Sequence, residues 1–224
     1  MDVDTWMRVL VRKLCCTFGP RLKFVGLQGS FARGEATESS DIDVVVVFDK
    51  LEIFDLMVYR EILSMMPNEE IACGFVSGAS ELAAWPRHEL FCLNVDTQPW
   101  YGDLGRFISE PTLDDALCSV RQGASGIYHL ACHTLLHCSG SQIDDRLKEL
   151  LKSSFFVLRS LIFIRTGSTV RSACDTALHL GGEEREIMDA FDCTRQLQSF
   201  SDSERQRILG ILTGWSSKVL KQSV

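Results

Sequence analysis

The sequence predicts an α+β fold, in which a small mixed β-sheet with flanking helices is followed by an all-α helical bundle. The apolar pattern alternates between strand-like and helix-like segments up to about residue 110 and is helical thereafter. The run DIDVVVVF at 41–48 is too apolar for a half-exposed strand and indicates a central strand covered on both faces. Residues 1–110 hold 10 basic and 17 acidic side chains, whereas 111–224 hold 13 of each. We therefore expect two domains, 1–110 and 111–224.

The first domain is expected to begin with a helix and to alternate strands with helices from there on. Its second long helix should end before Pro67, because proline cannot continue a helix. The predicted helices are 3–17, 51–66 and a short stretch at 81–85, and the predicted strands are 24–27, 41–48, 71–76 and 90–95.

The second domain shows only helical periodicity. Ser201 and Glu204 form a capping-box signature at the start of the last helix. The longest apolar run, 155–164, is interrupted by Arg159, and we interpret it as part of a core helix. The predicted helices are 112–138, 144–166, 171–180, 183–198 and 202–221.

Composition excludes several classes of protein. With 224 residues and 46% hydrophobic residues, the chain is long and apolar enough to bury a core, which excludes disorder. A net charge of −7 disfavours a nucleic acid template as partner. Nine cysteines without a C-x-x-C pair indicate reduced, intracellular use. The acidic N-terminus and the lack of an apolar run of about 18 residues predict a cytoplasmic chain with no membrane span.

A glycine-rich segment follows the first predicted strand. Gly29 and Ser30 leave that strand and enter a helix, where backbone N–H groups favour phosphate, and the Ser30 hydroxyl adds a hydrogen bond donor. Gly34 follows four residues later. Arg33 lies inside this loop, where it either reaches a triphosphate oxygen or pairs with a nearby glutamate, and Ser40 either contacts the nucleotide or orients the loop.

Asp41 and Asp43 stand two apart on the next predicted strand, so both carboxylates point to one face of the sheet. Two adjacent carboxylates repel each other, and a hard divalent cation relieves the repulsion. Mg²⁺ is the usual ion where substrate phosphates complete the coordination. The ordered set of strand, glycine loop and Asp-x-Asp therefore predicts a phosphate and Mg²⁺ site.

These residues resemble the signature G-S-x3-G followed by D-x-D of the nucleotidyltransferase superfamily, which includes DNA polymerase β and the aminoglycoside nucleotidyltransferases. The specific likeness covers 24–48, and a looser likeness to bacterial enzymes with a helical C-terminal domain covers most of the chain. The resemblance implies transfer of a nucleoside monophosphate from an NTP, ATP favoured, to a hydroxyl, with release of pyrophosphate. Two Mg²⁺ ions held by Asp41 and Asp43 would bridge the triphosphate.

The superfamily commonly uses a third acidic residue as metal ligand or general base. The strand 71–76 offers Cys73 where an acid is expected, and sulfur is badly matched to Mg²⁺. We prefer Asp96 for both roles, because it ends a predicted apolar strand, and Glu70 and Glu89 stay as alternatives. A turn residue that caps backbone N–H groups is the structural alternative for Asp96.

Three histidines, His129, His133 and His137, recur every four residues on one predicted helix. Three interpretations compete: a zinc site, partly buried histidines with satisfied ring nitrogens, and an acceptor-binding role for His129 or His133 in a cleft between the domains. Tyr128 would line the same acceptor site.

Three functions fit these observations. The first is an enzyme that modifies a hydroxyl of a small acceptor, with aminoglycoside-type antibiotics as the leading class. The second transfers the nucleotide to a side chain of a protein partner. The third is a non-catalytic nucleotide-binding module, which the absence of an obvious third acid favours.

Overall fold

The structure is a computed structural model, and it describes residues 2–38, 40–194 and 200–222. The chain divides into two compact units, Met1–Pro111 and Thr112–Val224.

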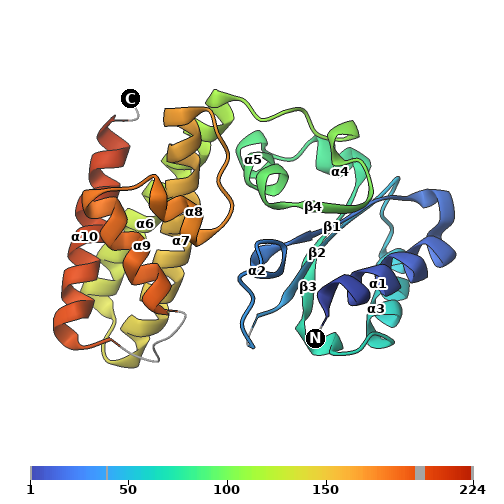
Figure 1. Ribbon diagram of the computed structural model, residues 1–224, viewed down its shortest axis with the longest axis horizontal. Coiled ribbons are helices and arrows are strands. Elements are labelled where there is room, and N and C mark those ends of the chain that lie inside the picture. The colour runs from blue at the N-terminus through green and yellow to red at the C-terminus, as the bar shows by residue number, and fades with distance from the viewer. Residues whose placement is uncertain (1, 39, 195–199, 223–224) are drawn as a thin grey trace. The chain divides into compact units, whose positions relative to one another are not determined.

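The first unit is built on a four-stranded mixed sheet (Figure 1). In the order β3-β2-β1-β4, β2 runs parallel to β3, and β1 runs antiparallel to both β2 and β4. The mixed sheet confirms the predicted fold class. The strands are β1 (Leu22–Gln28), β2 (Ile42–Phe48), β3 (Ala72–Gly78) and β4 (Gln98–Gly102).

Strand β2 is buried on both faces because its side chains alternate between two apolar clusters. Val44 and its even-numbered neighbours pack with helices α1 (Val3–Phe18) and α3 (Ile53–Ser64). Val45 and Val47 face the opposite cluster, to which α4 (Ala79–Ala83) and α5 (Arg87–Asp96) contribute. This double burial is what the uninterrupted valine run predicts for a central strand.

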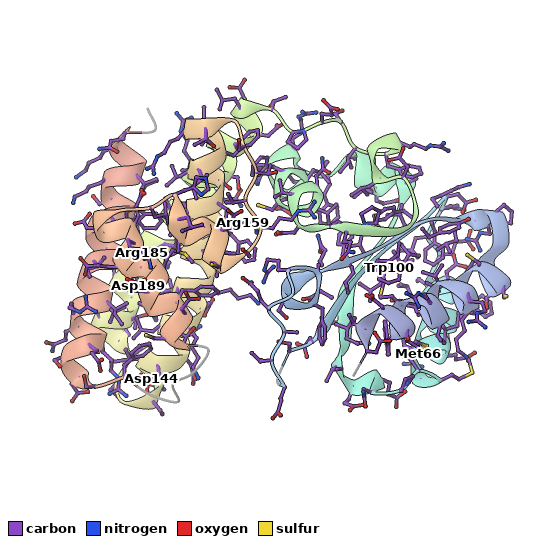
Figure 2. All side chains as sticks on the ribbon, in the orientation of Figure 1. Met66, Trp100, Asp144, Arg159, Arg185 and Asp189 are labelled. Atoms are coloured by element: carbon purple, nitrogen blue, oxygen red, sulfur yellow. The ribbon has the colours of Figure 1, made fainter. Side chains whose placement is uncertain are left out.

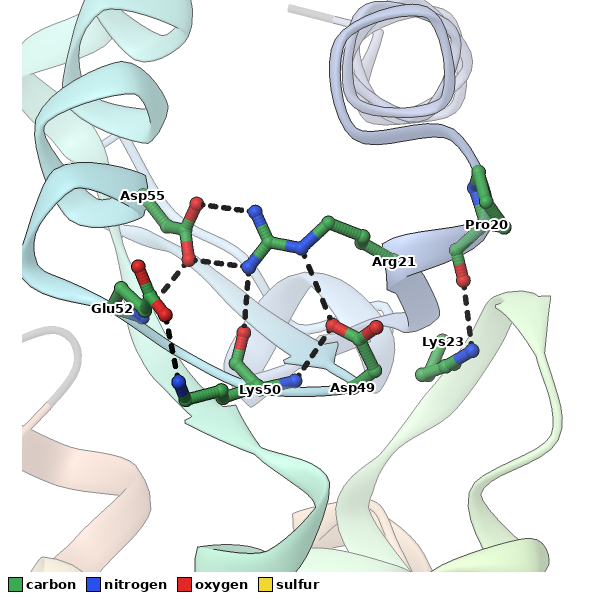
Figure 3. Close-up of polar contacts among 7 residues, drawn as sticks. All are labelled: Pro20, Arg21, Lys23, Asp49, Lys50, Glu52 and Asp55. Carbon is green, nitrogen blue, oxygen red and sulfur yellow. Dashed lines mark hydrogen bonds and ion pairs between the residues drawn. The ribbon is translucent and has the colours of Figure 1, made fainter.

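An arginine fixes the connection between β2 and α3 (Figure 3). Arg21 donates from both terminal nitrogens to the carboxylate of Asp55, at 2.8 and 2.7 Å, and one of these nitrogens also donates to the carbonyl of Lys50. The hydrogen bonds from Arg21 hold the pKa of Asp55 below its usual range. This ion pair joins the segment before β1 to the first turn of α3, away from Asp43.

The segment after α4 differs from the prediction. Residues 90–95, expected to be a strand, belong to the helix α5, and the fourth strand is instead Gln98–Gly102, which is absent from the predicted strands. A short apolar run does not distinguish a buried strand from a buried helix. Strand β4 lies at the edge of the sheet, where Pro99 is tolerated, and its proline and glycine hide the strand pattern.

The second unit is helical. Its helices cover the five predicted segments, although residues 195–198 of the fourth segment lie outside the described residues. They share one apolar core that includes Leu147, Met188 and Leu212. The helices are α6 (Leu113–His137), α7 (Ser141–Thr166), α8 (Ala173–Leu178), α9 (Gly182–Thr194) and α10 (Asp202–Gln222).

Two buried polar side chains tie the helices of this unit together (both are labelled in Figure 2). Asp144 of α7 accepts from Nε and Nη2 of Arg205 in α10, at 2.9 and 2.6 Å, and from the backbone N–H of Phe200. Arg159, buried in the core helix α7, donates from Nε to the carbonyl of Val170 at 2.8 Å. The predicted capping box also forms, since the N–H of Ser201 donates to the carboxylate of Glu204. Within the described ranges, every helix is too short or too polar to cross a membrane.

Candidate active site

Strand β1 ends at Gln28, and the short helix α2 (Gly29–Ala32) begins at once. Gly29 has φ +68°, a conformation that side chains with a Cβ rarely adopt. A Cβ built on Gly29 would lie 1.9 Å from Oδ2 of Asp43. The loop backbone therefore lies directly against this carboxylate, and only glycine permits that approach.

The rest of the glycine-rich loop is held by its own hydrogen bonds. The N–H of Glu35 donates to the carbonyl of Ser30 at 2.8 Å, and Gly34, at φ +70°, reverses the chain between them. Nε of Arg33 lies 3.0 Å from Oε2 of Glu35, and only 10% and 14% of the two side chains are exposed. The structure thus shows the glutamate pairing that was one alternative for Arg33.

Ser40 closes the turn that leads into β2. Its hydroxyl accepts from the N–H of Thr37 at 2.8 Å, and its own N–H donates to the carbonyl of Thr37 at 3.1 Å. These bonds orient the loop, the second of the two roles considered for this serine.

Asp43 occupies the middle of a row that crosses three strands. Its register partners are Gln28 on β1 and Cys73 on β3. Side chains of residues directly opposite one another lie on the same face of a sheet. Asp41, directly before β2, is exposed, and Asp43 is half-buried. The row therefore places a thiol, not a third carboxylate, next to Asp43.

The predicted third acid lies at the end of a helix rather than at the end of a strand. Asp96 is the last residue of α5 and is 8% exposed. Burial and the negative end of a helix are both unfavourable for a carboxylate, and such placements are more often found at functional sites. The two alternative acids are exposed: Glu70 precedes β3, and Glu89 accepts from Nε1 of Trp85 at 2.6 Å.

The end of α5 packs on the same face of the sheet as Asp43. Nε2 of Gln28 donates to Oγ1 of Thr97 at 2.8 Å and to the carbonyl of Leu93 at 3.2 Å. Thr97 also lies so close to Gly26 that a Cβ there would stand 2.4 Å from its Cγ2. Sequence reasoning missed Gln28 and Thr97, because no local pattern joins residues 69 positions apart.

The oxygen donors of Asp41 and Asp43 fit Mg²⁺, which prefers carboxylates together with phosphate oxygens and water. Among the residues that the structure describes, no three His, Cys, Asp or Glu side chains are arranged to hold a metal ion. The structure thus brings Asp43 and the Gly29 loop together without assembling a metal cluster of three carboxylates that includes Asp96.

The histidines of α6 are exposed, so the interpretation as partly buried side chains is wrong. The ring centroids of His129 and His133 lie 6.3 Å apart, and those of His133 and His137 lie 4.8 Å apart. Tyr128 is 41% exposed. In the described part of the chain these histidines do not form a group of three or more metal-binding side chains, so the zinc interpretation has no support.

Part of the first unit is similar to a known protein family. The family model "Nucleotidyltransferase domain" matches residues 9–81, which include the glycine loop, both aspartates and β3. Residues 9–81 therefore match a nucleotidyltransferase domain, and the resemblance inferred from Gly29, Ser30, Gly34, Asp41 and Asp43 is confirmed.

Two individual proteins are similar to the chain. A candidate protein adenylyltransferase of Methanocaldococcus jannaschii is 41% identical over 46 residues, which are 20% of this chain and 46% of that protein's length. The crystal structure of the spectinomycin adenyltransferase AAD(9) from Enterococcus faecialis, with ATP and spectinomycin, matches with a TM-score of 0.59 and 13% identity. That match covers 97% of this chain and 99% of the other. The chain resembles adenylyltransferases of the aminoglycoside type in its fold.

Proposed function

We propose that the protein is a Mg²⁺-dependent enzyme that transfers a nucleoside monophosphate from an NTP, ATP favoured, to a hydroxyl of a small acceptor. The observation that carries this proposal is the contact between the Gly29 backbone and the carboxylate of Asp43. It brings a phosphate-binding loop and a metal-binding carboxylate to one point, as transfer from a triphosphate requires.

In this proposal the loop binds the triphosphate, and the two strand aspartates hold the metal. The backbone N–H groups at Gly29 and Ser30 and the hydroxyl of Ser30 contact phosphate oxygens. Arg33 exchanges its partner Glu35 for a phosphate oxygen, while Ser40 keeps the loop in place. Asp41 and Asp43 would hold Mg²⁺, two ions in the sequence-based prediction, which would neutralise charge on the triphosphate and activate the attacking hydroxyl.

At the α-phosphorus the reaction forms one bond and breaks one, and one proton is transferred. The acceptor oxygen bonds to the α-phosphorus, the bond from that phosphorus to the oxygen bridging to the β-phosphorus breaks, and pyrophosphate leaves. The hydroxyl proton passes to a carboxylate, for which we propose Asp96. We assign Asp96 to the proton rather than to the metal, because the three aspartates form no metal cluster in the described residues.

A cationic small acceptor is the favoured substrate class. The first unit carries the whole formal net charge of −7, which attracts cations. The structural neighbour was crystallised with ATP and spectinomycin, so aminocyclitol and aminoglycoside antibiotics are the first acceptors to test. The exposed face of α6 with Tyr128, His129 and His133 is the proposed acceptor-binding surface. One observation favours a protein acceptor instead, namely the relative named as a candidate protein adenylyltransferase.

Pyrophosphate release decides among these functions. The full chain is assayed with each NTP and Mg²⁺ against spectinomycin, a panel of aminoglycosides and a panel of proteins including itself, with Asp43→Asn as the inactive control. Release that depends on a small acceptor supports the proposal, and labelling of a protein alone supports the second function. Binding of Mg²⁺-ATP without turnover on any acceptor would overturn both and leave the nucleotide-binding module.

A further inference from the structure

Gln28 connects three parts of the candidate site. It directly precedes Gly29, it is the register partner of Asp43, and its side chain binds the last turn of α5.

Both partners of the Gln28 side chain accept hydrogen bonds, so this side chain must be a donor. The hydroxyl of Thr97 has one proton, and Oγ1 lies 2.5 Å from the carbonyl of Leu93, to which it donates. Oγ1 must then accept from Gln28, and the Leu93 carbonyl is an acceptor as well. Only the amide NH₂ of glutamine satisfies both, so a carboxylate of the same shape would face two acceptors with no proton to donate.

The contact holds the chain on both sides of Asp96, at Leu93 in the last turn of α5 and at Thr97 directly after it. The carbonyl of Leu93 also accepts from the N–H of Thr97 at 3.2 Å, which is the last hydrogen bond of the helix. Thr97 is 5% exposed and fills the space left by Gly26. Asp96 lies between these two anchored residues, so its position relative to Asp43 depends on the bonds that Gln28 makes.

From these contacts we propose that Gln28 is a positioning residue, which holds the proton-accepting carboxylate of Asp96 on the face of the sheet that carries Asp43. This inference rests on the proposed function. Gln28 itself does not take part in the bond changes, because both hydrogens of its amide are used within the protein. It acts through Asp96, and its effect should disappear when Asp96 has already been disabled.

The test compares Gln28→Glu with the matched control Gln98→Glu. Gln98 lies on the neighbouring strand β4, opposite Leu27, whose side chain is in the cluster on the other face of the sheet. Gln28→Met, which is neutral and cannot donate, is the second variant in case the added charge prevents folding. Amide hydrogen exchange of the full chain is followed by mass spectrometry over residues 93–98. The kcat and the KM for the NTP are measured with the acceptor that the pyrophosphate-release assay identifies.

We expect faster exchange at 93–98 in both Gln28 variants and not in Gln98→Glu, with thermal unfolding of the rest of the chain little changed. We expect kcat to fall by about 10²-fold with KM for the NTP nearly unchanged, as small displacements of a catalytic group produce. In an Asp96→Asn background, Gln28→Glu should lower kcat less than about twofold further, because coupled residues are not additive.

Unchanged exchange at 93–98 would overturn the anchoring role, and additive losses in the double variant would overturn action through Asp96. A wild-type chain that releases no pyrophosphate on any acceptor would overturn the proposed function and, with it, the catalytic part of this inference. The exchange experiment would then still decide whether Gln28 holds the end of α5, so the two failures are distinguishable.

Discussion

The carboxylate of Asp43 stands where a side chain of Gly29 would have to be. A Cβ on Gly29 would come within 1.9 Å of Oδ2 of Asp43, and the backbone there has φ +68°. The glycine is therefore required for two independent reasons, the sterically restricted backbone and the space taken by the carboxylate. The second reason is the one tied to function, and the two can be separated experimentally.

Replacing Gly29 by alanine is expected to abolish nucleotide binding, because the new methyl group displaces Asp43 from the loop. The left-handed backbone alone costs about 1–3 kcal/mol for a residue with a Cβ. Gly167→Ala is the matched control, since Gly167 has φ +71° and no heavy atom within 4 Å of the added Cβ. Calorimetric titration with Mg²⁺-ATP and thermal unfolding are measured for both variants. Equal ATP affinity in the two would contradict the role of the Gly29–Asp43 contact.

Asp43→Asn is expected to abolish Mg²⁺-dependent NTP binding and transfer while the fold is kept. The amide has the shape of the carboxylate but lacks its charge, and a neutral amide is a weak ligand for Mg²⁺. Asp41→Asn should have the same direction of effect. Asp49→Asn serves as control, because Asp49 is exposed just beyond the other end of β2. Undiminished Mg²⁺-ATP binding in a double Asp41→Asn, Asp43→Asn variant would refute the metal assignment.

Asp144 predicts an acid-dependent loss of stability in the second unit. The hydrogen bonds from Arg205, and then the N–H of Phe200, hold the pKa of Asp144 below its usual range. The unfolded chain, with a pKa of about 3.9, binds the proton more readily. The stabilisation is therefore fully present above that pH and is lost as the pH falls through the folded pKa.

Asp144→Asn should lower the unfolding midpoint at neutral pH, and its difference from the wild type should shrink in acid. Asp145→Asn, at the exposed neighbouring position, is the control and should change neither. Denaturant unfolding followed by circular dichroism from pH 7 to about pH 3 measures both effects. A difference that is independent of pH would contradict the role of the charge.

The parts of the fold that the sequence predicts are those with a long, regular pattern. The run of four β-branched valines after Asp43 favours a buried strand, and the helical periods of the second unit extend over many turns. The prediction for α5 and β4 failed for two reasons. The ten residues of α5 have scattered apolar side chains that fit a helix or a strand, and Pro99 disrupts the sequence pattern of the edge strand β4.

The same distinction holds for the candidate site. One part of the site is a local motif, and its residue types and spacing are enough to predict phosphate and Mg²⁺ binding. The motif consists of Gly29, Ser30, Asp41 and Asp43. The role inferred for Gln28 depends on contacts with residues 65 and 69 positions away, and these follow from how α5 packs on the sheet. Because α5 was predicted to be a strand, Asp96 was expected at the end of a strand. It is instead the buried last residue of a helix.

The need for a third acid distinguishes the proposed enzyme from a nucleotide-binding module. Two aspartates and a loop are enough to hold Mg²⁺-ATP, but fast attack by a hydroxyl needs a group that takes its proton. The residue in register with Asp43 on β3 is Cys73, a soft sulfur ligand that suits Mg²⁺ poorly. The carboxylate of Asp96 is buried, and the helix that it ends is bonded to Gln28 through Thr97, so we propose Asp96 as the better candidate.

Asp96→Asn is therefore expected to lower kcat by roughly 10²–10⁴-fold, the usual contribution of a general base, with Mg²⁺-ATP affinity nearly unchanged. Cys73→Ala should keep most of the activity, and Glu89→Gln, at an exposed position on the same helix, controls for a change of charge. Single-turnover measurements separate the chemical step from product release. Full activity of Asp96→Asn together with inactivity of Cys73→Ala would overturn the assignment of Asp96. The thiol of Cys73 would then be the group that the chemical step requires.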